Sequence, residues 1–130
     1  MGLFSKLLPT KRTGDLGESA AARYLETKGF RVLERNWRYR QWELDLICLD
    51  RDTVVFVEVK TRKANSMASP ADGLTRKKQA RLVKAASHYL TQNDLWDKPC
   101  RFDLAAVVDT GSSMDVEHCE NAFDLSGMEI

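Results

Sequence analysis

The segment Val54–Lys60, which reads VVFVEVK, constrains the fold of this chain more than any other segment. Its first residues are apolar at consecutive positions, so an extended strand here would be apolar on both faces. Such strands are typical of the interior of a sheet that is covered on both sides. Glu58 and Lys60 share the face of Val54 and Phe56, and unpaired charges are costly to bury. The segment therefore predicts a central strand that ends in a polar environment.

The pattern around this strand predicts two helices and further strands. Apolar residues at helical spacing predict a helix over 14–28, with Asp15 and Glu18 as a capping box and Gly29 as its end. A second helix is expected over 74–92. Strand patterns occur at four other places: 30–40, 44–49, 101–109 and 116–123. This order predicts an α/β fold, in which a single mixed β-sheet is flanked by helices.

Length and composition favour one globular domain. The chain has 130 residues, of which 43% are hydrophobic and 30% charged, unlike the composition of a disordered protein. We expect a flexible basic leader over 1–12, the folded domain over 13–124 and a tail over 125–130. No segment approaches the roughly 18 apolar residues of a membrane span. Three widely spaced cysteines without a C-x-x-C motif favour reduced thiols in the cytoplasm.

The net charge of +1 hides an uneven distribution. Residues 1–40 hold nine Lys and Arg against four acids, and residues 61–90 hold seven against one. Residues 101–130 instead hold one Arg against seven acids. The basic segments indicate a surface that attracts a polyanion such as DNA. Solvated outer faces of ordinary helices explain the same pattern, so charge alone leaves both interpretations open.

Asp45 begins the strand that precedes the central one. If these two strands form a hairpin around residues 50–52, Asp45 lies opposite about residue 57, within one position of Glu58. Two carboxylates and the Lys60 ammonium would then converge at one end of the sheet. Oxygen ligands of this kind suit Mg²⁺ or Mn²⁺, which activate water and offset charge on a phosphate. An ordinary ion pair between Glu58 and Lys60 at a strand end accounts equally well for the spacing.

The D…E-x-K pattern of Asp45, Glu58 and Lys60 resembles the signature of restriction-endonuclease-like nucleases. More narrowly, the chain over residues 13–124 resembles the YraN-type family of small bacterial endonuclease-like proteins. The resemblance is carried by five ordered segments: 14–18, 35–38, 56–60, 101–103 and 121–123. Trp42 stands where that family usually has a Gly before its Glu. The resemblance implies a restriction-endonuclease-like αβββαβ core.

The resemblance also implies site residues and an activity. Asp45 and Glu58 are expected to be ligands of Mg²⁺ or Mn²⁺, and Lys60 the catalytic lysine. Glu18 is implied as an outer acid, as in the related archaeal-type Holliday junction resolvases, although its place in a capping box offers a structural role instead. The implied activity is metal-dependent endonucleolytic hydrolysis of DNA phosphodiester bonds, with structured or branched DNA as substrate. A homodimer is expected by analogy only.

Other polar residues have a functional and a structural interpretation. The residues expected to contact nucleic acid are Arg62, Lys77, Lys78, Gln79 and Arg81, although a solvated basic face is the alternative for the helix. Glu43 is expected on the side of Asp45, either as a further site acid or as a solvated one. Trp37 would stack on a base or pack in the core. His88 and His118 are expected to be structural, and Asp103 to pair with Arg101.

Two other functions compete with nuclease activity. The chain would be a nucleic-acid-binding module without turnover, or an adaptor that contacts DNA-processing proteins through its acidic tail. Metal-dependent cleavage separates the nuclease from both alternatives. Salt-sensitive DNA binding separates the binding module from the adaptor.

Overall fold

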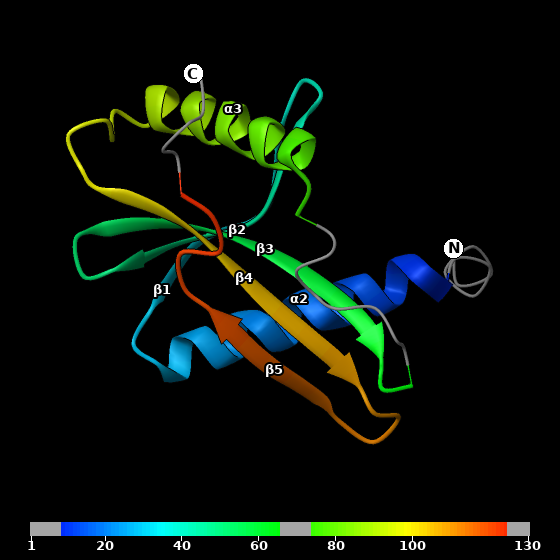
Figure 1. Ribbon diagram of the computed structural model, residues 1–130. Coiled ribbons are helices and arrows are strands. Elements are labelled where there is room, and N and C mark those ends of the chain that lie inside the picture. The colour runs from blue at the N-terminus through cyan, green and yellow to red at the C-terminus, as the bar shows by residue number, and fades with distance from the viewer. Residues whose placement is uncertain (1–8, 66–73, 125–130) are drawn as a thin grey trace, which may run out of the picture.

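The computed structural model describes residues 9–65 and 74–124 and consists of one sheet between two helices (Figure 1). The expected tail over 125–130 and residues 1–8 of the expected leader lie outside the described residues. Within the described part, no helix has the length and apolar character needed to cross a membrane. The elements in chain order are α2 (Pro9–Thr27), β1 (Arg31–Tyr39), β2 (Trp42–Asp50), β3 (Thr53–Lys63), α3 (Arg76–Gln92), β4 (Cys100–Asp109) and β5 (Met114–Cys119).

The five strands form a mixed sheet in the order β1-β2-β3-β4-β5. Neighbouring strands are antiparallel except for β3 and β4, which run parallel. A parallel pair needs a long crossover connection, and the connection between these two strands contains α3. The predicted α/β class is confirmed, and the order αβββαβ, followed by β5, is consistent with a restriction-endonuclease-like core.

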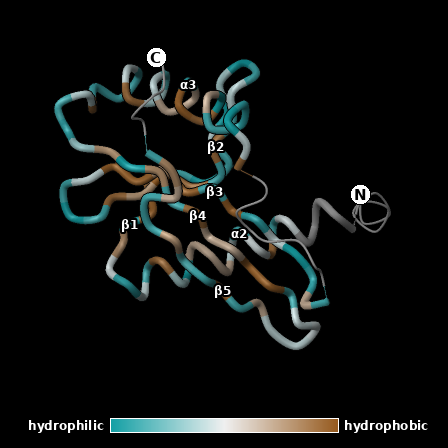
Figure 2. The backbone as a smooth tube through the Cα atoms, viewed as in Figure 1, coloured by the Kyte–Doolittle hydropathy of each residue, from teal (hydrophilic) through white to brown (hydrophobic). Residues whose placement is uncertain are grey.

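The strand β3 is central and buried on both faces, as its sequence predicts. Val55 and Val57 belong to the core layer that contains Ala21 and Leu25 of α2. Val54 and Phe56 belong to the opposite layer, together with the buried face of α3. Apolar residues accordingly concentrate along the central strands, and the surface loops are hydrophilic (Figure 2).

The first helix begins earlier than the sequence pattern predicted. The helix α2 starts at Pro9 rather than near residue 14, so residues 9–12 are helical and do not belong to a flexible leader. Proline is favoured in a first helical turn, where its missing N–H has no partner to lose. Asp15 and Glu18 therefore lie within the helix, and the predicted capping box is wrong. The predicted end is confirmed, because Gly29 has a φ of +92° directly after the last turn.

A close approach fixes α2 against the end of β3. A Cβ atom added to Gly17 would lie 1.9 Å from the Oγ1 atom of Thr61. Only glycine permits this distance between the helix and the strand. The neighbouring residue on the helix, Glu18, is thereby held over the part of the sheet where Asp45 and Glu58 lie, and its charge raises the pKa of Asp45.

The last predicted strand is shorter than expected and begins sooner. It was expected over 116–123, but β5 spans Met114–Cys119. The chain then turns at Asn121, which has a φ of +52°. The N–H of Ala122 donates to the carbonyl of Phe102 at 2.8 Å. Phe123 stacks on Phe102, so the end of the domain closes the α3 side of the core.

Candidate active site

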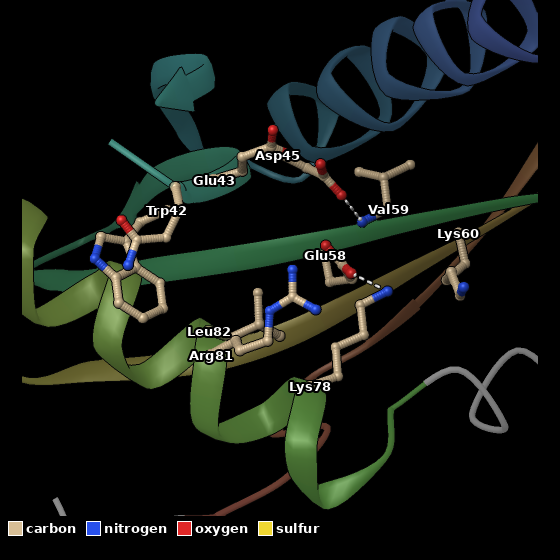
Figure 3. A pocket seen from close by; sticks show the side chains of 10 residues that line it. Trp42, Glu43, Asp45, Glu58, Val59, Lys60, Lys78, Arg81 and Leu82 are labelled. Carbon is tan, nitrogen blue, oxygen red and sulfur yellow. Dashed lines mark hydrogen bonds and ion pairs between the residues drawn. The ribbon is translucent and has the colours of Figure 1, made fainter. Parts of the chain in front are cut away.

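A polar pocket of about 440 Å³ opens between α3 and the adjoining parts of β2 and β3 (Figure 3). Apart from Leu82 and Val59, its lining side chains are charged, polar or aromatic. The lining residues are Gln41, Trp42, Glu43, Asp45, Glu58, Val59, Lys60, Lys78, Arg81 and Leu82. The pocket therefore contains the three residues of the D…E-x-K pattern together with two cations from α3.

The strand β2 departs from regular alternation at Asp45. Leu44 and Leu46 are two positions apart, yet they belong to opposite core layers. The ladder with β3 runs from Asp50 to Leu46, whose partner is Val57. Beyond this last pair, the backbone N–H of Val59 donates to the side-chain oxygen Oδ2 of Asp45 at 2.9 Å. A side-chain oxygen thus replaces a backbone acceptor and holds the Asp45 carboxyl against β3.

The register of this hairpin brings Asp45 to Glu58. The ladder ends with Leu46 opposite Val57, so Asp45 and Glu58 directly follow the last pair on their two strands. The hairpin predicted from the sequence, with Asp45 opposite about residue 57, agrees with this register to within one position. Burial, a hydrogen bond with Glu58 and repulsion from the Glu58 charge together raise the pKa of Asp45 to about 8. Burial contributes most, because it penalises the ionised form. Near neutral pH the two groups therefore carry fewer than two negative charges.

Glu58 has a basic partner that comes from the helix. Lys78 Nζ lies 2.7 Å from Glu58 Oε2, and the two side chains are 33% and 11% exposed. Figure 3 shows Lys78 reaching from the first turns of α3 toward the sheet. The N-cap Thr75 helps to place it, because the Thr75 side chain accepts a hydrogen bond from the Lys78 backbone N–H. Lys78 is thus bound to an acid of the site and does not lie on a solvated face.

Glu18 approaches the site from the other face of the sheet. Burial raises the pKa of Glu18, and a hydrogen bond with Asn36 opposes that rise. The charges of Glu18 and Glu58 repel each other, and Glu18 also raises the pKa of Asp45. Within the described ranges the Glu18 Oε1 atom is buried and has no hydrogen-bond partner. Glu18 lies near the acid pair but does not line the pocket.

Of the other expected DNA contacts, Arg81 lines the pocket beside Lys78, together with the expected catalytic residue Lys60. Lys77 is exposed on α3, and Arg62 is half-buried on β3 outside the pocket. Gln79 Nε2 donates to the carbonyl of Leu74 at 2.9 Å, so part of its amide closes the turn before the helix.

The residues of the pocket fit a hydrated divalent cation better than a metal cage. Across residues 9–65 and 74–124, no three His, Cys, Asp or Glu side chains are close enough together to hold a metal ion. Mg²⁺ is usually bound through one or two carboxylates, with water and phosphate oxygens completing its shell. Asp45 and Glu58 supply that number of carboxylates, and a cation would relieve the repulsion that raises the pKa of Asp45. The donor set therefore fits Mg²⁺ or Mn²⁺ that shares its shell with a substrate.

Aromatic residues at the pocket form a cluster that the sequence pattern did not reveal. Trp42 stacks on His88 of α3 with ring centroids 5.9 Å apart, and Tyr39 packs on the same imidazole at 5.2 Å. Trp37 packs edge-on against Tyr89 in the α3 layer, so its core interpretation is correct. The only sequence signal for Trp42 was its position, three residues before Asp45, within the segment that resembles the nuclease signature.

A second buried acid serves structure instead. Asp103 is 2% exposed, and Arg101 Nε donates to it at 3.0 Å. His118 Nε2 lies 2.7 Å from the same carboxylate, and the Asn121 N–H donates to it at 3.1 Å. The predicted pair of Asp103 with Arg101 is confirmed, as is the structural role of His118.

The fold and the pocket together define a class: a small α/β protein with one mixed sheet and a polar pocket that contains an acid pair and basic side chains. The chain belongs to the uncharacterised protein family UPF0102, whose model matches residues 17–107. This finding confirms the resemblance to the YraN-type family. The matched range contains Asp45, Glu58, Lys60, Lys78 and Arg81.

Several relatives are similar over most of their length. The UPF0102 protein of Nitratidesulfovibrio vulgaris (strain Hildenborough) is 49% identical over 114 residues, which covers 88% of this chain and 85% of that protein. The UPF0102 protein of Lawsonia intracellularis is 44% identical, with 86% and 85% covered. That of Myxococcus xanthus is 43% identical, with 85% and 88% covered.

Proposed function

We propose that this protein is a metal-dependent endonuclease that hydrolyses DNA phosphodiester bonds. The observation that carries the proposal is the contact between Asp45 and Glu58 in a pocket whose other charged lining residues include Lys60, Lys78 and Arg81. The acid pair suits a divalent cation, and the basic side chains suit the phosphate that the cation would share. A pocket for an uncharged substrate would gain little from six ionisable side chains of mixed sign.

Asp45 and Glu58 would hold Mg²⁺ or Mn²⁺ between them. The bound cation would supply positive charge to the phosphate oxygens and acidify an attacking water. Asp45 would give up its proton to hold a cation, because positive charge nearby favours the carboxylate. The backbone N–H of Val59, which donates to Asp45 Oδ2, would hold the carboxyl in place.

Lys60 would act on the scissile phosphate. It follows Glu58 by two positions on β3, and both residues line the pocket. An ammonium group there would orient the attacking water and stabilise the negative charge that develops on phosphorus oxygens. Lys78 and Arg81 reach the same pocket from α3. They would bind the phosphates that flank the reacting phosphate along the DNA strand.

The exposed cations of α3 would extend the contact along the DNA backbone. Lys77 and Lys84 are exposed on this helix, and neither lines the pocket. Phosphate contacts of this kind are independent of sequence and weaken with salt. The substrate preference is therefore expected to follow the shape of the DNA, with structured or branched DNA as the first candidates.

The proposal is tested with the purified chain and labelled single-stranded, duplex, flap and four-way-junction DNA. Cleavage is expected with Mg²⁺ or Mn²⁺ and is expected to stop with EDTA. Cleavage that persists in EDTA would overturn the role of the acid pair. Salt-sensitive binding without cleavage of any substrate would favour a nucleic-acid-binding module, and RNA versions of the same strands test the choice of DNA.

A further inference from the structure

We propose that Trp42 is a stacking platform for one unpaired nucleobase, which makes the pocket selective for single-stranded nucleotides over intact duplex. This inference rests on the proposed function, because it names the substrate class of the same site. Aromatic side chains bind bases through their ring faces, and base–aromatic stacking is a main source of affinity for single strands.

The indole ring of Trp42 is held firmly from one side. It is inclined by 26° to the His88 ring, and Tyr39 packs on the same imidazole. His88 belongs to α3, so the helix supports the ring from outside the strand that carries it. Trp42 nevertheless lines the pocket and remains partly exposed. Trp42 also packs against the core layer on the α3 side. An aromatic ring that is supported by His88 and still borders a polar pocket is suited to receive a second ring from that pocket.

The charges beside Trp42 match the rest of a nucleotide. Arg81 lies between Trp42 and Lys78 along the pocket, and both basic side chains come from α3 (Figure 3). A nucleotide with its base on Trp42 would place its phosphate toward Arg81 and the acid pair. This arrangement joins an aromatic surface to a phosphate site, which is the combination found in grooves for single strands.

The size of the pocket favours an unpaired nucleotide. A volume of about 440 Å³ is in the range of pockets that enclose one small ligand. Within a duplex, both faces of each base are covered by neighbouring bases. Stacking on Trp42 therefore requires a base that has left the duplex or was never paired.

Two substitutions separate base stacking from simple packing of β2 on α3. Trp42→Phe keeps an aromatic face, whereas Trp42→Leu keeps apolar contact with His88 but has no such face. The matched control is Trp96→Phe, because Trp96 is 58% exposed, follows α3 and does not line the pocket. Thermal melts confirm that each variant is folded before binding is compared.

Binding is measured by fluorescence anisotropy in EDTA, with a labelled single strand and a labelled blunt-ended duplex that has no unpaired bases. Trp42→Leu is expected to weaken single-strand binding by at least about fivefold and to leave duplex binding unchanged. Trp42→Phe is expected to retain most of the affinity, and Trp96→Phe all of it. Equal single-strand affinity in Trp42→Leu and wild type, or equal losses on both DNAs, would overturn the proposal.

The outcome is independent of cleavage. Single-strand binding that requires Trp42, in a protein that cuts no DNA with Mg²⁺ or Mn²⁺, would refute the nuclease proposal and leave the stacking platform standing. Cleavage by a Trp42→Leu variant that binds single strands as wild type does would refute only the platform.

Discussion

Lys78 Nζ lies 2.7 Å from Glu58 Oε2, so an acid suited to a divalent cation is already paired with a cation of the protein itself. The two groups come from α3 and β3, which are consecutive elements of the chain. Because Glu58 is 11% exposed, the pair also neutralises a charge that would be costly to bury alone. Lys78 is therefore expected to compete with a divalent cation for Glu58. When the cation binds, Lys78 is expected to leave Glu58 and bind a substrate phosphate.

Replacing Lys78 by Met is expected to strengthen Mn²⁺ binding and weaken DNA binding. The pair is partly exposed, so its removal should raise Mn²⁺ affinity by only about two- to fivefold. Mn²⁺ binding is followed by electron paramagnetic resonance without DNA. The control is Lys77→Met, which removes an equal charge from the exposed side of the same turn. Equal Mn²⁺ affinity in both variants and wild type would show that Lys78 does not compete for Glu58.

Stability of the metal-free protein is expected to fall with pH because of Asp45. Its pKa is about 8 in the folded chain and about 4 in the unfolded chain. Between these values the folded state binds more protons than the unfolded state, so the free energy of unfolding decreases as pH rises. Asp45→Asn removes this proton. Its melting temperature relative to wild type should rise steadily between about pH 4 and pH 8 in EDTA. A constant difference over that range would contradict the assigned pKa.

Adding one methyl group at Gly17 is expected to disturb the contact between α2 and β3. The new Cβ would lie 1.9 Å from Thr61 Oγ1, and overpacking of this kind typically costs about 1–3 kcal/mol. The free energy of unfolding of Gly17→Ala, measured in urea, should fall accordingly, and Thr61→Ala should recover part of the loss in the double variant. Gly14→Ala is the control, since nothing lies within 4 Å of its Cβ position. Similar stability of both Ala variants would show that the contact is not tight.

Asp103, like Glu58, is an acid with basic partners, but its assigned role is structural. Its substitution is therefore expected to lower the stability of the fold. Asp103→Ala would leave Arg101 and His118 without their shared carboxylate and should cost about 3 kcal/mol of unfolding free energy. This is the low end for a buried pair, because Arg101 keeps its contact with Asp50 at 3.0 Å. Chemical denaturation measures the loss. An unchanged free energy of unfolding in Asp103→Ala would contradict the structural role assigned to this network.

Much of the fold and half of the site follow from local patterns. The consecutive apolar residues of β3 identify a central strand, and a short hairpin turn fixes which residue faces Glu58. The start of α2 was predicted too late because residues 9–13 do not continue the apolar repeat of the rest of the helix. The contact of Lys78 with Glu58 was not predictable, since it depends on where α3 lies across the sheet. The stacking of Trp42 on His88 depends on the same packing and was missed for the same reason.

The central claim is that Glu58 helps to hold a divalent cation for hydrolysis, and Glu58→Gln tests it most directly. Glutamine keeps nearly the same shape but lacks the anionic oxygen that Mg²⁺ requires. The measurement is Mg²⁺-dependent cleavage by wild type and by this variant, with DNA binding and thermal melts on the same samples. The account predicts that cleavage collapses in a folded variant that still binds DNA. Full cleavage by well-folded Glu58→Gln protein would contradict it.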